Sequence, residues 1–567
     1  MRKNLRNLGL LVVAGCMAVT AAQVQAADAP ASRPARTTLD LSAARTIPVQ
    51  YGGRVMPLDT LARQIAWQVT GKQSLQGLDP VELLLGWTWQ SDFWRDQPVV
   101  LVGSPDLQEK VGLPVDAKRF SYAELMGNRS LMQLMGTKPL ADDDTSESAV
   151  LRSAQQVAFR LDLLAQVFKG GVIRLVPSKD PHAAWATIDE AAQTMGQADR
   201  MRLKAALDKM REGFVSADAA GFDAGARELT VALAGMRTPT KGDPSLIALE
   251  VRYNQFRPFR LGWVLACLAM AIGLVELGWP KKPLRYATWV LLAAGFVALT
   301  AGIIMRWRFA GHAPLATMYE SLVFMGWGAV AIGLVTAAVV QLRSSLAIIA
   351  GVATAILIVA DTAPLDSISS PLVPVLRNTM WLTYHVLTIM LAYSAFALAM
   401  GVGHVQAAFL AFRPGNTERT GQTGRLLYGM LIVGCVFLAA GIIFGAIWAN
   451  KSWGRYWGWD PKETWSLITL LGYMAILHGR LVGWIRSFGL AICSILGFQL
   501  VLMTYYGVNF VLGRGLHSYG FSSGGQLWIG LYVAAELAFV LWMWALHTRL
   551  AGAAPAGQKA FETAASE

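Results

Sequence analysis

Hydrophobic residues divide the chain into two parts. Residues 28–258 mix short apolar runs with polar stretches, whereas long apolar runs follow one another from Leu261 onward. A transmembrane helix needs about 20 predominantly apolar residues. Runs of that order recur at 261–279, 286–305, 320–340, 345–360, 380–408, 426–448, 465–483, 487–511 and 526–546. The pattern predicts an all-α fold, a membrane bundle of about nine spans preceded by a separate domain.

The first part, residues 28–258, has the pattern of a mostly helical soluble domain. From Asp189 to Arg211, Ala, Met and Leu recur at helical spacing among Lys and Arg. A Pro/Ala/Ser-rich stretch at Ala27–Arg36 predicts a flexible start, and Thr238–Pro244 predicts a second break. Because no catalytic signature stands out in this domain, its role stays unassigned.

Residues 1–27 are typical of an export signal. Arg2, Lys3 and Arg6 precede an apolar run that ends near Ala22, and Val24-Gln25-Ala26 resembles a signal-peptidase site. Two alternatives remain, a lipoprotein site at Val13-Ala14-Gly15-Cys16 or an uncleaved anchor. All three interpretations place residues 28–258 outside.

The charge distribution favours membrane topology over nucleic-acid binding. Residues 28–258 carry 27 Lys+Arg and 27 Asp+Glu, whereas residues 259–567 carry 19 and 10. A nucleic-acid footprint would need a basic soluble face, which a neutral domain does not offer. With residues 28–258 outside, the inner loops hold Lys281, Lys282, Arg285, Arg343, Arg413, Arg419, Arg425, Arg480, Arg486, Arg549 and Lys559, and the outer loops hold Arg306, Arg308, Arg377, Lys451, Arg455, Lys462 and Arg514. The positive-inside rule therefore supports the same orientation, with residues 551–567 as a cytoplasmic tail.

The four cysteines predict neither a disulfide framework nor a metal site. Cys16, Cys267, Cys435 and Cys493 stand singly in apolar stretches. The chain also lacks a Cys-x-x-Cys-His motif, so it has no usual attachment site for c-type haem.

An aromatic loop, residues 453–465, lies between the sixth and seventh predicted spans on the outer side. Five of its thirteen residues are Trp or Tyr. An interfacial aromatic belt would explain two or three tryptophans, but not this density or the two glycines. A flat apolar macrocycle with anionic edges would suit indole faces, Gly454 and Gly458 for close approach, and Arg455 or Lys462 for carboxylates. The composition alone therefore suggests haem.

The end of this loop also has the signature of a helix start. Asp460 stands at the N-cap position, Pro461 at the first helical position and Glu463 at the third. Asp460 is therefore either a helix cap, a ligand contact, or both.

The loop resembles a known signature, Trp-Gly-x-x-Trp-x-Trp-Asp-Pro-Lys-Glu-Thr, of the CcsA (ResC) family in the system II cytochrome c synthase. The continuation Lys462-Glu463-Thr464 favours system II over related haem handlers of the other bacterial system. Further similarities are Gly311-His312-x-Pro314, Tyr319-Glu320, Trp381-x-x-x-His385, His478-x-Arg480 and Gly515-Leu516-His517-Ser518-Tyr519. The resemblance spans about residues 300–525, and Gly52–Thr60 resembles a segment that precedes the membrane part in a subset of such proteins.

This resemblance implies roles for three histidines and the loop. His385 lies about six residues inside the fifth span, roughly 9 Å from its outer end, and His517 lies in an outer loop. His478 lies about thirteen residues into the seventh span, roughly 20 Å from its outer end. By resemblance, His385 and His517 ligate the iron of an external haem and His478 that of a second haem in transit. Trp453, Trp457 and Trp459 would frame the macrocycle, with Asp460 beside it.

Other ionisable residues receive weaker assignments. His312 shares a family motif, and its role stays open between starting a helix and contacting a haem propionate. His404 and His547 lie near inner ends of spans and are interpreted as interfacial, while His182 has no partner pattern. Glu536, near the middle of the ninth span, needs an internal partner that the sequence does not reveal.

The implied activity is cytochrome c assembly. In the family, two thiols of an apocytochrome c Cys-x-x-Cys-His segment add across the vinyl groups of non-covalent haem b, outside the bacterial plasma membrane. The chain would thus be part of a haem lyase or synthase complex with a CcsB (ResB)-like membrane protein, which supplies the other ligand of the transmembrane haem. No residue is assigned as catalytic acid or base. The alternatives are a haem transporter without synthase activity and a purely structural haem-binding subunit.

Overall fold

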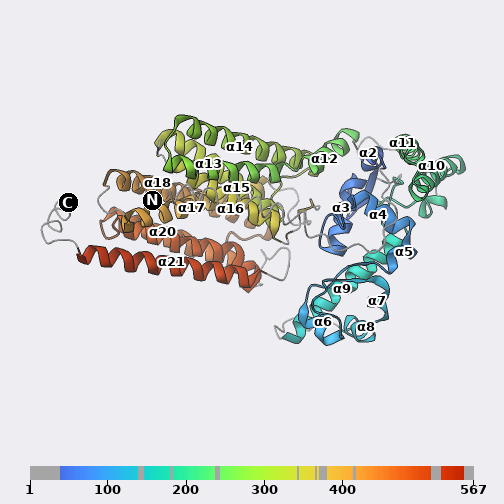
Figure 1. Ribbon diagram of the computed structural model, residues 1–567, viewed down its shortest axis with the longest axis horizontal. Coiled ribbons are helices and arrows are strands. Elements are labelled where there is room, and N and C mark those ends of the chain that lie inside the picture. Colours follow the sequence, from blue (N-terminus) through green and yellow to red (C-terminus); the bar gives the residue numbers. More distant parts are fainter. Residues whose placement is uncertain are drawn as a thin grey trace.

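The computed structural model describes residues 39–553, apart from 138–145, 179, 181–182, 194, 237–242, 341, 343, 364, 366, 370–379, 413–416 and 513–524. An N-terminal domain and a helical bundle follow one another along the long axis (Figure 1). Each has its own hydrophobic core, the first running from Leu41 to Leu233 and the second from Phe259 to Met543. The signal-like segment 1–27, His182 and His517 lie outside the described residues.

The N-terminal domain is mostly helical, as predicted, with two small antiparallel sheets. The first sheet pairs β1 (Pro48–Tyr51) with β2 (Arg54–Pro57), and the second pairs β3 (Pro98–Leu101) with β4 (Arg119–Ser121). Its helices are α2 (Ser42–Arg45), α3 (Leu58–Thr70), α4 (Pro80–Trp89), α5 (Ser91–Arg95), α6 (Pro105–Val111), α7 (Tyr122–Gly127), α8 (Arg129–Met135), α9 (Ser146–Phe168), α10 (Gln197–Ser216) and α11 (Ala219–Ala234).

Turn and cap chemistry sets the ends of these elements. Gly52 and Gly53 join β1 to β2 with φ of 57° and 82°, the paired positive values of a two-residue hairpin turn. Helix α10 begins at Gln197 and not at Asp189, because a 3₁₀ turn at Glu190–Gln193 and the extended Gly196 come between. The helical pattern in the sequence therefore included the 3₁₀ turn that precedes α10.

The helices at the predicted apolar spans are α13 (Pro258–Gly278), α14 (Lys282–Ala310), α15 (Met318–Val340), α16 (Ser345–Thr362), α17 (Met380–Phe412), α18 (Thr417–Trp453), α19 (Pro461–Leu481), α20 (Ser487–Leu502) with the π-helical segment η3 (Met503–Leu512), and α21 (Gln526–Ala553). The shorter α12 (Pro244–Phe256) precedes them and was not predicted as a span. Helix α12 leads into α13 across Arg257, whose φ is 46°, and Pro258. Since proline cannot donate the next helical hydrogen bond, the break falls there.

Within the described ranges, eight helices are long and apolar enough to cross a membrane. The chain is therefore a multi-pass membrane protein. Helix α19, the seventh predicted span, is not among the eight, and it carries Lys462, Glu463 and Arg480. It nevertheless runs antiparallel to α20 and η3, since Lys462 meets Asn509 at one end and Gly479 packs on Ile485 at the other. It returns the chain across the bundle, as the nine-span prediction requires.

Helix α17 lies at the centre of the bundle and contacts α15, α16, α18, α20 and α21. Small residues permit this packing: a Cβ added to Gly434 would lie 2.3 Å from the Phe396 ring, and one added to Gly403 2.3 Å from Ser494 Oγ. Close approach of helix backbones is the usual mode of packing in membranes, where the lipid supplies no hydrophobic drive between helices.

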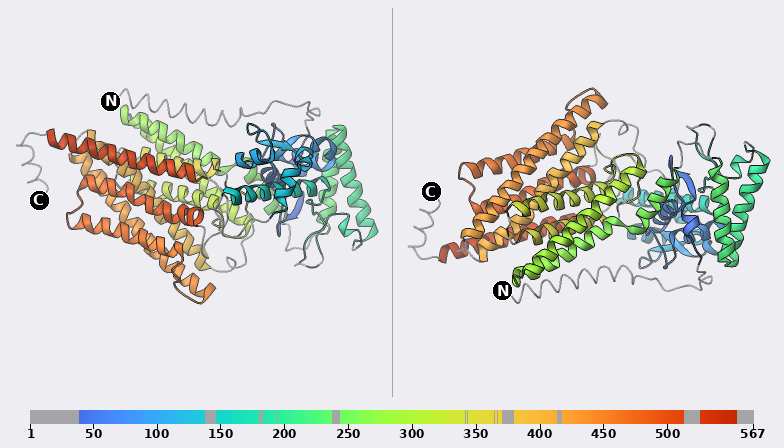
Figure 2. Two further views of the ribbon diagram at one scale, coloured as in Figure 1. Left: turned by 90° about the horizontal axis from the view of Figure 1, so that it is seen from below. Right: turned by 90° about the horizontal axis from the view of Figure 1, so that it is seen from above.

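The N-terminal domain sits at one end of the bundle in all three views (Figures 1 and 2). Its α12 continues into the first spanning helix, and Gln73 after α3 donates to Ser367 Oγ, beyond α16, at 2.9 Å. The domain is therefore in contact with the end of the bundle at which α14 ends and α15 begins.

Candidate functional site

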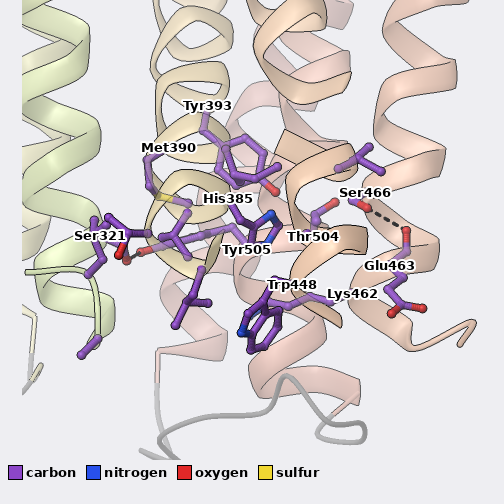
Figure 3. Close-up of a pocket in the computed structure, with 18 of the residues that line it drawn as sticks. Ser321, His385, Met390, Tyr393, Trp448, Lys462, Glu463, Ser466, Thr504 and Tyr505 are labelled. Carbon is purple, nitrogen blue, oxygen red and sulfur yellow. Dashed lines mark hydrogen bonds between the residues drawn. The ribbon is translucent and has the colours of Figure 1, made fainter. Parts of the chain in front are cut away.

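A cavity of about 260 Å³ opens at the end of the bundle that faces the N-terminal domain. Figure 3 shows its wall, built from α15, α17, α18, α19 and η3. Apolar side chains of α17 and α18 form much of it, and polar groups lie around them. The lining includes Leu382, Val386, Ile389, Met390, Ile442 and Ala446 on the apolar side, and His312, His385, Lys462, Ser466, Thr504 and Asn509 among the polar groups.

His385 holds a defined orientation in this wall. It lies in the second turn of α17, and its Nδ1 donates to the carbonyl of Gly441 on α18 at 2.7 Å. Because a carbonyl only accepts, the neutral ring carries its proton on Nδ1, and Nε2 is the nitrogen with the lone pair. The ring also lies parallel to the Trp448 indole, with centroids 6.4 Å apart. A hydrogen bond on the far ring nitrogen is the usual support of a metal-binding histidine.

The aromatic loop contributes to the cavity unequally. Tyr456 and Trp457 line it. Trp453 packs edge-on against Trp448 at 4.7 Å, one layer behind the cavity, and Trp459 meets Trp457 edge-on at 5.8 Å. Trp459 is 68% exposed and has φ of 56°, an uncommon conformation for a bulky residue that is found mostly at functional sites.

Glycines shape the loop locally. Gly454 has φ of 73°, which side chains other than glycine rarely adopt. Gly458 lies under the Arg455 guanidinium, whose nearest atom would be 1.8 Å from a Cβ placed there. A side chain at position 458 would therefore collide with Arg455, and the predicted close approach of a macrocycle to the two glycines stays a prediction.

Asp460 is a helix cap, as its sequence context predicted. Its Oδ1 accepts from the Lys462 amide at 2.9 Å, and Glu463 Oε2 accepts from the amides of Gly458 and Asp460 at 2.7 and 3.2 Å. The Asp460 side chain does not line the cavity. The carboxylates therefore fix the chain where the aromatic loop joins α19.

Lys462 presents a positive group to the cavity wall. Its Nζ donates to Asn509 Oδ1 of η3 at 2.9 Å. Lys462 lies in the first turn of α19, before the apolar part of that helix, which starts at Trp465. Burial lowers the pKa of Lys462 to about 8, although the Asp460 carboxylate acts in the opposite direction. An anionic group in the cavity would favour the charged ammonium.

Substitutions at Asp460 can show whether its carboxylate acts as a helix cap, as a ligand contact, or as both. We expect Asp460→Ser to retain the function of the protein, because serine caps helices nearly as well, whereas Asp460→Ala should cost about 1 kcal/mol of stability. Thermal unfolding in detergent and ligand retention by the purified variants measure the two effects. Loss of the ligand in Asp460→Ser, with unchanged unfolding, would instead identify the carboxylate as a ligand contact.

The loop between α14 and α15 forms another wall. His312, Ala316 and Thr317 line the cavity from this loop. The loop is held by Glu320, whose Oε2 accepts from the amides of Ala316 and Thr317 at 2.7 and 3.3 Å. Glu320 Oε1 in turn accepts from Arg306 Nε at 2.7 Å, and the two side chains are 1% and 2% exposed. Removing one partner of such a buried pair costs about 3–5 kcal/mol.

The π-helical segment η3 supplies residues that the sequence did not single out. Tyr505 Oη lies 2.7 Å from Ser321 Oγ of α15 and donates to the Met318 carbonyl at 3.2 Å. Thr504 bonds to Thr469 Oγ1 of α19 at 2.8 Å. π-Helical segments occur often at functional sites. The polar residues within the otherwise apolar eighth span could have indicated this part of the cavity wall. Likewise, Trp448 of α18, just before the aromatic loop, could have been recognised as a lining residue.

His478 lies apart from this cavity. Its side chain is exposed on the surface of α19, and its Nδ1 bonds to the Met474 carbonyl at 2.7 Å. The structure thus brings His385 and Trp457 together and leaves His478 separate, while His517 lies outside the described residues. His385 and His312 are the histidines of the described residues that line the cavity.

The partner that Glu536 needs is His404. Glu536 Oε2 of α21 lies 2.8 Å from His404 Nε2 of α17, and His404 Nδ1 bonds to the Met400 carbonyl at 2.9 Å. His404 thus contacts Glu536 across two helices of the bundle, a contact that its interpretation as an interfacial residue did not include. His547 stacks on Phe488 with centroids 4.0 Å apart.

Comparison with known proteins places the membrane part in a family. The family model "Cytochrome C assembly protein" matches residues 315–517. The cytochrome c biogenesis protein CcsA of Synechococcus sp. (strain CC9902) is 34% identical over 294 residues, covering 46% of this chain and 94% of that protein. CcsA of Prochlorococcus marinus subsp. pastoris is 36% identical over 290 residues, covering 45% and 89%.

A longer relative extends the similarity toward the N-terminus. Protein NrfI of Wolinella succinogenes is 31% identical over 507 residues, covering 82% of this chain, so the match reaches into the N-terminal domain. The chain spans about half of NrfI, 53% of its length. A solved structure, cytochrome c haem lyase CcmF, is 18% identical with a TM-score of 0.38, covering 52% of this chain and 50% of that one.

The matches cover 94% and 89% of those two CcsA proteins. The residues matched by the family model, 315–517, include the aromatic loop and most of the residues that line the cavity. The chain belongs to the CcsA family of cytochrome c biogenesis proteins.

Proposed function

We propose that the cavity holds haem and presents it for attachment to apocytochrome c. The observation that carries this proposal is the position of His385: its imidazole lines a mainly apolar cavity that also includes Trp457 of the aromatic loop. Haem iron takes axial nitrogen ligands readily. The Nδ1 bond to Gly441 supports Nε2 as the ligand atom.

The other walls suit the rest of the macrocycle. Leu382, Ile389 and Met390 offer apolar contact to its face, and Lys462 offers a charge-assisted hydrogen bond to a propionate. His312 is a second candidate for a propionate contact. His517 is proposed as the other axial ligand of this haem, with Trp453 and Trp459 supporting Trp457 around it.

The residues of the chain would bind and orient haem and exclude water from it. In the proposed reaction, each cysteine sulfur bonds to one vinyl carbon and its proton goes to the other, so no oxidant is consumed. The cofactor supplies the reactivity, and the protein supplies approach and orientation. No side chain is proposed as general acid or base.

Partners and orientation follow from the same proposal. The acceptor is apocytochrome c on the periplasmic side of the plasma membrane, the end of the bundle with the N-terminal domain. The basic residues Lys281, Lys282 and Arg486 at the opposite end support this orientation. A CcsB-like protein would contribute the second ligand for a haem bound at His478, which the exposed position of His478 on α19 would permit.

The absorption spectrum of the purified protein tests haem binding. We expect the full chain, expressed with a CcsB-like protein and purified in detergent, to show a haem Soret band. Expression with an apocytochrome c should then yield a cytochrome whose haem resists acid-acetone extraction. A protein without a Soret band under every expression condition contradicts the proposal.

A haem transporter without synthase activity is the second candidate. It rests on His478, which is exposed on α19 and does not line the cavity, and which would bind haem in transit under this proposal. The measurement that separates the two is thioether formation by the purified complex with apocytochrome c and haem. Haem binding with no covalent product would favour transport.

A further inference from the structure

The motif Gly52–Thr60 binds the helix that leads into the membrane. Arg54 donates from both terminal nitrogens to Glu250 of α12, at 2.8 and 2.7 Å, and Thr60 donates to Glu250 Oε1 at 2.9 Å. Asn254, one turn further along α12, donates to Asp59 Oδ2 at 2.9 Å. The Glu250 side chain is 4% exposed, so these charges are withdrawn from water. The motif therefore joins the N-terminal domain firmly to α12.

The same helix reaches the end of α14. Tyr253 lies between Glu250 and Asn254 in α12, and its hydroxyl oxygen accepts from Arg306 Nη1 at 3.2 Å. The Tyr253 ring meets the Phe309 ring at 5.3 Å, and the Arg54 guanidinium lies 5.8 Å from the centroid of that same ring. Arg306 also donates to the Ser367 carbonyl at 2.8 Å. The N-terminal domain thus contacts the residues that surround Arg306.

Arg306 is the link to the cavity. Its Nε donates to Glu320, and Glu320 binds the amides of Ala316 and Thr317 in the cavity wall. Consecutive buried contacts therefore run from Arg54 through Glu250 and α12 to Arg306, Glu320 and the loop that carries His312. Removing one charge from such a buried network leaves its partner unpaired, which favours a rearrangement of the neighbouring contacts.

We infer that the N-terminal domain positions the cavity loop 311–317 through Glu250, Tyr253, Arg306 and Glu320. These are positioning residues, since the described side chains of Glu250, Tyr253, Arg306 and Glu320 do not line the cavity. The domain acts as a brace that holds one wall of the binding site. The consequence for haem rests on the proposed function, whereas the consequence for the loop does not.

The position of the loop can be measured without haem. In the full chain with its native cysteines replaced, Ala313→Cys places a thiol in the cavity wall. We expect Glu250→Gln and Glu320→Gln each to raise its rate of alkylation by about tenfold, as expected for coupling between sites. Combining the two should add little to Glu320→Gln alone, because both act on one element. Arg54→Lys, which keeps the charge, should give a smaller increase than Arg54→Gln.

The control is Glu228→Gln, which breaks an exposed ion pair with Lys209 in the same domain and should leave the alkylation rate unchanged. If Glu250→Gln leaves the rate unchanged while Glu320→Gln raises it, the loop is held locally and the inference fails. If the double variant shows fully additive effects, the two residues act separately, which also overturns it.

Haem retention distinguishes this inference from the proposed function. In haem-loaded protein, Glu250→Gln should lower haem retention about tenfold and change the Soret band, and Glu228→Gln should do neither. If the alkylation rates change as expected but no variant binds haem, the brace on the loop stands and the proposed function falls. If haem is bound and Glu250→Gln leaves both retention and spectrum unaltered, the brace does not act on the site.

Discussion

His385→Ala is expected to abolish haem retention in the cavity and formation of holocytochrome c. The imidazole is held by Gly441 and faces the cavity, so its removal deletes the proposed iron ligand and leaves its space empty. The loss should exceed the roughly 10–100-fold that removal of an outer partner costs a metal site. The Soret absorbance per purified protein and the yield of covalent cytochrome measure it.

Added imidazole gives this prediction a specific check. In His385→Gly, imidazole in the buffer should restore part of the Soret band, because the vacated space has the shape of the lost ring. His547→Ala is the matched control, since that ring stacks on Phe488 and does not line the cavity. Normal haem content and normal cytochrome yield in His385→Ala would show that the ligand assignment is wrong.

Gly445→Ala is expected to lower haem retention by tenfold or more without preventing folding. Gly445 of α18 lines the cavity, and an added Cβ would lie 2.7 Å from Cε1 and Nδ1 of His385. The ring must move, and its bond to Gly441 is then lost. Overpacking of this size costs about 1–3 kcal/mol, and 1.4 kcal/mol is about tenfold in an equilibrium constant. Haem titration of the purified variants measures the loss.

Gly429→Ala on the same helix is the control, because no other atom lies within 4 Å of a Cβ placed there. That change should leave haem retention as it is, and it should stabilise α18 by up to about 1 kcal/mol. Equal haem affinity in Gly445→Ala and Gly429→Ala would contradict a binding role for the His385 side of the cavity.

The membrane fold was largely predictable because lipid leaves few choices to a spanning segment. Backbone groups in the bilayer core must be satisfied within a helix, so apolar length alone locates the spans. Helix α19 tested this rule, since its charged ends make it less apolar than the eight others. The N-terminal domain was harder to predict. Its two short sheets depend on contacts between strands, which the spacing of hydrophobic residues along the sequence does not reveal.

The candidate site was predictable in composition but less so in arrangement. The sequence Asp460-Pro461-Lys462-Glu463 predicted that Asp460 caps a helix, and the structure confirms this cap. Trp453 lies behind the cavity, whereas Trp457 lies in its wall. This difference depends on where α18 ends and on the path of the loop, which the sequence pattern does not show. The partner of Glu536 could not be read from the sequence, because α17 and α21 are 132 residues apart at the His404 contact. The assigned haem roles of these residues stay predictions.

The contact between His404 and Glu536 bears on how the chain is inserted. Helix α21 follows α17 in the chain, and most of its apolar stretch is exposed in the bundle, so few packed side chains retain it. An acidic residue in the middle of a lipid-facing helix opposes insertion by about 2.5–3.5 kcal/mol. His404 of α17 provides the hydrogen-bond partner that this carboxyl group requires. The pairing satisfies the carboxyl group within the bundle and so lowers the cost of keeping a sparsely packed helix in the membrane.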